Sequence, residues 1–147
     1  MIKFDQITSD LTYLGNSIKS ISLTNSTICL SENAEKSFGM DIEIGEITTT
    51  NERHIGKILL KLQVVILENN DENMKLDMLI EGYFSSSATI TKNDFKNQIA
   101  INGAAALYSI ARTKVEIISA MTFLSGKVTL PMVNIIEYYK VMNENNE

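Results

Sequence analysis

Apolar and polar residues alternate along three stretches of the chain, residues 38–44, 57–67 and 76–84. Side chains of a β-strand point to opposite faces in turn, so this alternation is typical of strands with one buried face and one solvated face. A fourth stretch, residues 18–30, is rich in Ser, Thr and β-branched residues, and its apolar phase changes near Thr24. Such a change predicts a strand that contains a bulge or a bend.

Short polar segments join these stretches, which favours antiparallel pairing of successive strands. Residues 68–73 predict a hairpin loop, and residues 51–56, which contain His54, predict a turn. The second strand is expected to continue past a kink at Gly45. Residues 3–17 carry apolar side chains at helical spacing, so they predict a short helix or an irregular lead-in.

The apolar period changes to three and four residues after Phe84, which indicates helices. A short helix is predicted from a cap at Thr91 or Asn93 to about Ala100, with an interruption at Asn102. The helices therefore follow the strands along the chain instead of alternating with them.

A long helix is predicted over residues 107–121, ending near Gly126. Residues 127–131 are expected to be extended, because Pro131 restricts the conformation of the residue before it. Asn134 is the predicted cap of a last helix.

These elements define an α+β fold, in which C-terminal helices pack on one side of a four-stranded antiparallel sheet. We expect a single domain over residues 1–142 and a disordered tail over residues 143–147. The long helix is apolar on more than one face, and a sheet covers one stripe of a helix, so a second copy of the chain is expected to cover another. The residues predicted for this homo-oligomer interface are Leu107, Tyr108, Val115 and Ile118.

The net charge of -5 and the single cysteine, Cys29, narrow the classes of function. An acidic chain disfavours nucleic acid and anionic membranes as partners, and charged residues interrupt the one apolar run that could insert into a bilayer. A lone cysteine cannot form an internal disulfide, which fits a reducing compartment. Asp5 and Asp10 lie where a signal peptide needs an apolar run. We therefore expect a cytoplasmic protein.

Residues typical of catalytic or metal sites are sparse. His54 lies in the predicted turn with no Ser or Cys placed beside it, and Cys29 lies at an apolar strand end, where a buried and inert thiol is expected. The chain has no C-x-x-C, H-E-x-x-H or G-x-x-x-x-G-K motif, so no metal, nucleotide or other cofactor is predicted, and no enzymatic activity is expected. Arg112 either pairs with Glu116, four residues later, or anchors a neighbouring loop.

Two segments of the C-terminal third resemble the signature of SecB-type export chaperones. They are ALYSIAR at residues 106–112 and LPMVNI at residues 130–135, separated by an apolar helix and Gly126. The family signature has the form L-Y/F-P-x-x-R, a helix, a glycine, and then L-x-P-x-N-F or L-P-P-x-N. Here Ser109 replaces the usual proline and Ile135 replaces an aromatic residue. The predicted strands also follow the order of strands in this family.

The resemblance implies a homo-oligomeric chaperone, commonly a tetramer, that holds unfolded polypeptides in apolar grooves without ATP. Its partners would be precursors for export, delivered to a SecA-type motor, or a cognate antitoxin. An acidic face for docking such a motor is expected on the solvated side of the sheet, at Asp41, Glu43, Asp77 and Glu81. By elimination, the polypeptide-binding residues are predicted to be Tyr83, Phe84, Met121, Phe123, Leu124 and Ile135.

Two other classes of protein stay open on the sequence. Hotdog-type acyl thioesterases and small-ligand binders also combine an antiparallel sheet with a long helix, and they need a carboxylate or amide on that helix facing a subunit cleft. Glu116 is the candidate for this role. A structural or phage-type assembly component has no positive sign in the sequence.

Overall fold

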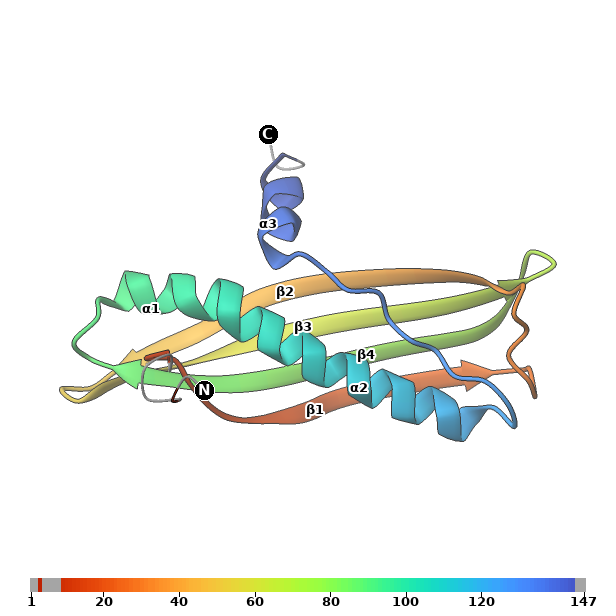
Figure 1. Cartoon of the computed structure of the whole chain (residues 1–147), viewed down its shortest axis with the longest axis horizontal. Coiled ribbons are helices and arrows are strands. Elements are labelled where there is room, and N and C mark those ends of the chain that lie inside the picture. The colour runs from red at the N-terminus through yellow and green to blue at the C-terminus, as the bar shows by residue number, and fades with distance from the viewer. Residues whose placement is uncertain (1–2, 4–8, 145–147) are drawn as a thin grey trace.

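Four long strands form one antiparallel sheet with the strand order β1-β4-β3-β2 (Figure 1). The computed structural model describes residues 3 and 9–144. The strands are β1 (Thr12–Asn25), β2 (Glu35–Thr49), β3 (Arg53–Glu68) and β4 (Asp71–Ser87). Because β1 and β2 are the outer strands, each has one edge that no other strand of the described chain covers.

The helices lie on one face of this sheet, which confirms the predicted α+β fold. Helix α1 (Lys92–Gln98) and helix α2 (Ala104–Thr122) run across the sheet, and α3 (Ile135–Glu144) stands on the side of β2 (Figure 1). None of the helices in the described residues is long and apolar enough to cross a membrane.

Strand β1 begins earlier than the sequence predicts. The expected helix or lead-in over residues 3–17 is wrong for residues 12–17, which belong to this strand. Residues 4–8 of that prediction lie outside the described residues.

Bulges in β1 explain why its sequence obscures the period of two. Its register against β4 shifts between Tyr13 and Gly15 and again between Ile18 and Ser20. Each shift moves the following apolar residues to the other phase. The bulges therefore precede the position near Thr24 at which the sequence placed one.

The other strands follow the predicted pattern closely. The register of β2 against β3 shifts between Ile44 and Ile47, which confirms the kink at Gly45. The turn between β3 and β4 consists of Asn69 and Asn70, with φ of 55° and 66°. Two consecutive residues with positive φ are typical of a tight hairpin turn that matches strand twist.

Helices α1 and α2 are joined without a break. Thr91 caps α1, as predicted, but the expected interruption at Asn102 is wrong, because Ile99–Gly103 form a π-helical turn, η2, that leads directly into α2. Gly103 faces the sheet here, and a Cβ atom at this position would lie 3.1 Å from a side-chain atom of Ile58. The glycine therefore permits close approach of helix and sheet.

The core lies between the sheet and one stripe of α2. Leu107, Tyr108 and Val115 are all buried in it, which corrects their predicted place in an oligomer interface. Ile118, the fourth residue of that prediction, is half-buried against the core. The prediction assigned the two apolar stripes of the helix to the wrong surfaces. The sequence pattern reveals both stripes, but it does not show which one faces the sheet. The solvent-facing stripe carries Ile117 and Met121.

Candidate functional site

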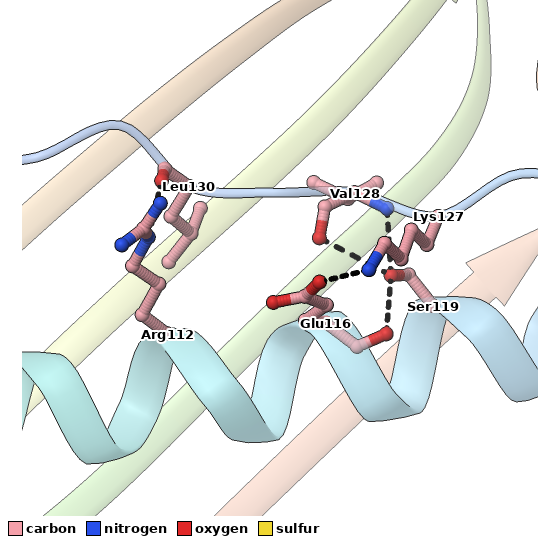
Figure 2. Close-up of polar contacts among 6 residues, drawn as sticks. All are labelled: Arg112, Glu116, Ser119, Lys127, Val128 and Leu130. Carbon is pink, nitrogen blue, oxygen red and sulfur yellow. Dashed lines mark hydrogen bonds and ion pairs between the residues drawn. The ribbon is translucent and has the colours of Figure 1, made fainter.

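A return segment, residues 123–134, leads from the end of α2 back along the same helix to α3. The hydroxyl of Ser119 on α2 accepts a hydrogen bond from the backbone N–H of Val128 at 2.8 Å and donates one to the Glu116 carbonyl at 3.0 Å (Figure 2). Ser119 is buried, so this hydroxyl satisfies a backbone donor that water cannot reach.

Arg112 holds the middle of the return segment. Its Nε donates to the backbone carbonyl of Leu130 at 2.6 Å (Figure 2). Glu116 forms an ion pair with Lys127 of the return segment. Of the two roles open to Arg112 on the sequence, the structure shows the anchor.

Tyr108 adds a further contact between α2 and the return segment. Its hydroxyl donates to the Pro131 carbonyl at 2.6 Å. Burial raises the pKa of this hydroxyl, an effect that the nearby Arg112 charge partly opposes. Tyr108 and Arg112 belong to the segment that resembles the SecB signature, and they contact the other segment of that signature. The two halves of the motif therefore form one structural unit.

The return segment leads to α3, which lies at the edge of the sheet. Asn134 caps α3, as predicted, because its Oδ1 accepts from the backbone N–H groups of Ile136 and Glu137 at 3.0 and 3.2 Å. Helix α3 continues to Glu144, so residues 143 and 144 of the predicted tail are helical, and residues 145–147 lie outside the described chain.

The hydroxyl of Tyr138 ties α3 to β2. It accepts a hydrogen bond from the backbone N–H of Ile42 at 3.0 Å and donates one to Asp41 Oδ1 at 3.1 Å. Burial is the main reason that the pKa of Tyr138 is raised. The helix thus covers part of an edge strand whose N–H groups would otherwise face solvent.

An apolar groove of about 480 Å³ lies between the return segment, α3 and β2. Its lining is mostly apolar, and four of its apolar side chains are exposed to solvent, those of Met132, Val133, Val141 and Met142. Its lining residues are Met40, Met132, Val133, Asn134, Glu137, Tyr138, Val141 and Met142. Exposed apolar surface of this kind marks a site for a ligand or for another polypeptide.

The six residues predicted to bind polypeptide do not line this groove. Phe84, Phe123 and Ile135 are buried in the core, which corrects their assignment to an exposed surface. Met121 and Leu124 are exposed, but at the far end of α2, and Tyr83 lies on the opposite face of the sheet. The sequence signal for the groove was the amphipathic pattern of residues 135–144 next to Met132 and Val133.

The predicted acidic face of the sheet is neutralised by lysines. Asp41 pairs with Lys61 at 3.6 Å, Asp77 with Lys75 at 3.9 Å, and Glu81 with Lys19 at 3.3 Å and with Lys57 at 3.9 Å. Glu43 has no ion pair within the described residues. This corrects the expectation of an acidic docking face, because neighbouring strands of the sheet bring lysines to Asp41 and Glu81, and β4 itself supplies Lys75 beside Asp77.

Glu81 is the most enclosed of these carboxylates. The Tyr83 hydroxyl, which donates to it at 2.6 Å, is the main cause of a lowered pKa of Glu81. Burial opposes this effect, and the charge and hydrogen bond of Lys19 reinforce it. Lys19 is the extra residue of the bulge between Ile18 and Ser20, so the ion pair fixes an irregular point of an edge strand.

The residues considered for catalysis have structural roles or lie apart from one another. His54 is not in a solvated turn, because β3 begins at Arg53 and the side chain is 4% exposed. Its Nε2 donates to the carbonyl of Ile90 at 2.9 Å, and its Nδ1 lies 2.9 Å from the Thr49 hydroxyl. The ring stacks on Phe95, so it joins the sheet to α1.

Cys29 and Glu116 also differ from expectation. Cys29 is exposed, which corrects its predicted burial. Glu116 is engaged by Lys127, and α2 lies on a sheet that does not wrap around it, so the arrangement lacks the free helix carboxylate of the hotdog alternative. Within residues 3 and 9–144, no group of three or more His, Cys, Asp and Glu side chains could hold a metal ion.

Comparisons with known proteins bear on the fold. No protein-family model matches the chain, and no curated protein matches it. The fold is similar to that of the Mycobacterium tuberculosis Rv1957 SecB-like chaperone, solved in complex with a ChAD peptide from the Rv1956 HigA1 antitoxin. The TM-score is 0.58, at 11% identity over 84% of this chain and 91% of that one. At this identity the likeness establishes a SecB-like fold.

A second solved structure is a protein of unknown function from Streptococcus agalactiae. It gives a TM-score of 0.43 at 12% identity, over 83% of this chain and 97% of that one.

Proposed function

We propose that this protein is a SecB-like chaperone that holds segments of non-native polypeptide in the groove between β2, the return segment and α3. The observation that carries the proposal is an open groove of about 480 Å³ lined mainly by exposed apolar side chains. The SecB-like fold supports it, because a protein with that fold was solved with an antitoxin peptide bound.

Holding requires no covalent chemistry. A client segment that buries about 200 Å² of apolar surface gains about 5 kcal/mol at roughly 25 cal/mol per Å², and the cost of ordering the client chain offsets much of that gain. Binding is therefore reversible and needs no ATP to release the client. Met40, Met132 and Met142 suit varied clients, because the thioether side chain is flexible and polarisable.

A role in holding an antitoxin or a similar dedicated client fits this protein better than a role in delivering precursors to a SecA-type motor. A motor that recognises an acidic sheet surface would meet ion pairs here, since lysines neutralise Asp41, Asp77 and Glu81. Client release would then depend on the client's own folding or on its binding to a partner.

We further propose that a second copy of the chain covers the solvent-facing stripe of α2. This stripe carries small or apolar uncharged side chains over its whole length, an unusual composition for a helix face in water. Its members are Ala105, Ser109, Thr113, Ile117, Ala120 and Met121. Several grooves in one assembly would raise the apparent affinity for a long client through effective concentration.

The proposed function is tested by aggregation of a reduced, unfolded client followed by light scattering. The wild-type protein at stoichiometric amounts is expected to delay aggregation. Val141→Lys places a charge in the groove at an exposed position of α3, so it should weaken this activity about tenfold without unfolding the protein.

Ile28→Lys is the matched control, because Ile28 is an exposed apolar residue outside the groove. The control is expected to retain wild-type activity. Failure of the wild-type protein to delay aggregation or to bind the unfolded chain would contradict the proposed function. Equal activity of the two variants would contradict the location of the site.

A further inference from the structure

Met132 has an unusual environment for an exposed methionine. Its side chain is 79% exposed and lines the groove, yet its sulfur accepts a hydrogen bond from Arg112 Nη1 at 3.2 Å. The guanidinium is itself fixed, because Arg112 Nε donates to the Leu130 carbonyl at 2.6 Å. One side chain of α2 therefore holds both the backbone before Met132 and the sulfur of Met132.

The other methionines of the described chain provide a comparison. Met74 and Met78 are buried in the core, and Met40 is half-buried against it. Met142 also lines the groove, but it is 39% exposed against 79% for Met132. Met121 is 76% exposed in the single chain but lies outside the groove, on the stripe of α2 that we propose a second copy covers. Met132 thus combines high exposure, a place in the groove and a fixed cationic donor at its sulfur.

We propose that Met132 is a site of reversible oxidation by peroxides, and that its oxidation lowers the affinity of the groove for clients. The effect on clients rests on the proposed function. In the reaction, a sulfur lone pair attacks one oxygen of hydrogen peroxide and forms the S–O bond. The O–O bond breaks, and the departing hydroxide takes up the proton of the transferred hydroxyl and leaves as water. The thioether loses two electrons, which reduce the peroxide.

The Arg112 guanidinium favours the product of this reaction. A sulfoxide oxygen is a much stronger hydrogen-bond acceptor than a thioether sulfur, and a charged donor strengthens the bond further. The oxidised side chain would therefore stay at the groove, held by the Arg112 guanidinium. There it replaces apolar surface with a polar group that an apolar client segment cannot satisfy.

The test combines peroxide treatment with peptide mapping by mass spectrometry and a measurement of client affinity. Met132 is expected to be oxidised well before the buried Met74 and Met78. Wild-type affinity for an unfolded client should fall about tenfold, and methionine sulfoxide reductases should restore it.

Three variants separate the site from general oxidation. Met132→Leu should keep its client affinity in peroxide, whereas Met121→Leu should lose as much affinity as the wild type. Met132→Gln, which places a polar group at this position, should have reduced affinity without any oxidant. Unchanged affinity after complete conversion of Met132, or equal sensitivity of Met132→Leu, would overturn the proposal.

One readout does not involve a client. The Arg112 side-chain NMR resonances should shift on peroxide treatment of the wild type and of Met121→Leu, but not of Met132→Leu. Absence of this shift in the wild type would overturn the modification site. Loss of client binding in the untreated protein would instead overturn the proposed function alone.

Discussion

The phenolic oxygen of Tyr138, on the C-terminal helix, lies 3.0 Å from the backbone nitrogen of Ile42 on β2 and accepts its hydrogen bond. These residues are 96 positions apart in the sequence. Alternate N–H groups of an outer strand such as β2 point away from the sheet, and the N–H of Ile42 is one of these. A side-chain hydroxyl thus supplies the acceptor that a neighbouring strand would otherwise provide, and it fixes one wall of the groove.

Tyr138→Phe removes this acceptor while keeping the ring. The variant is expected to lose about 1 kcal/mol of stability and to show faster hydrogen exchange at the Ile42 amide. Tyr139→Phe is the matched control, because the Tyr139 hydroxyl is buried without a hydrogen-bond partner among the described residues. It should be neutral or slightly stabilising. Equal exchange at Ile42 in both variants would show that the Tyr138 bond does not form in solution.

Ser119→Ala is expected to destabilise the protein by about 1–3 kcal/mol, because it leaves the buried N–H of Val128 unpaired. Ser109→Ala is the control on the same helix. Ser109 is exposed and donates to the Ala105 carbonyl of its own helix, so its loss should change stability by no more than about 0.5 kcal/mol. Urea denaturation measures both, and a neutral Ser119→Ala would contradict the role of Ser119 as an anchor.

Arg112→Met keeps an apolar stem but removes the donor to the Leu130 carbonyl. We expect a loss of about 1–2 kcal/mol, at the lower end for a charged donor because Arg112 is half-buried. Weaker client holding should accompany this loss, since the return segment carries part of the groove. Lys114→Met, at a similarly half-buried position, should leave both properties unchanged. Wild-type stability and client holding in Arg112→Met would contradict the role of Arg112 as an anchor of the return segment.

Glu81 should contribute to acid sensitivity. The folded state lowers its pKa below the ordinary value of 4.5, so its stabilising contribution is present above that pH. The contribution is lost as the pH falls from 4.5 through the folded-state pKa. Glu81→Gln should therefore flatten the acid limb of a plot of unfolding free energy against pH. Glu43→Gln, at an exposed carboxylate of the same face, should retain the wild-type slope.

The mass of the protein in solution tests the proposal that a second copy of the chain binds the solvent-facing stripe of α2. Sedimentation at micromolar concentration should give an oligomer for the wild type. Ile117→Lys, at a residue that is 54% exposed in the single chain, should shift the mass toward the monomer. Ile28→Lys should not. A monomeric wild-type protein would rule out this interface.

The strands were predictable because the sheet has one buried face, so residues such as Ile58 and Leu60 enter the core at every second position. The cap at Thr91 was equally readable, since it depends on a local hydrogen bond. Prediction failed where the outcome depends on distant partners. Whether Tyr108 or Ile117 faces the sheet is set by how α2 is rotated on it, and both choices satisfy the helical period.

The groove was harder to predict because its lining comes from three separate parts of the chain. Met40 is on a strand, Met132 is on a segment with no periodic pattern, and Val141 is on a helix. Phe84 and Phe123 were predicted as client contacts because they are aromatic, but both side chains are buried in the core. Likewise, the expected acidic face is neutralised in part by Lys61 and Lys19, which lie on strands paired with those of Asp41 and Glu81.

The return segment is held mainly through its backbone. Val128 contributes its N–H, and Leu130 and Pro131 contribute their carbonyls, to side chains that all belong to α2. Any residue other than proline supplies the same backbone groups, so the side chains at Met132 and Val133 can change without loosening that attachment. Substitutions at these two positions can therefore alter which polypeptides the groove binds while the return segment keeps its attachment to α2. The same fold could in this way retain a client whose own sequence changes during evolution.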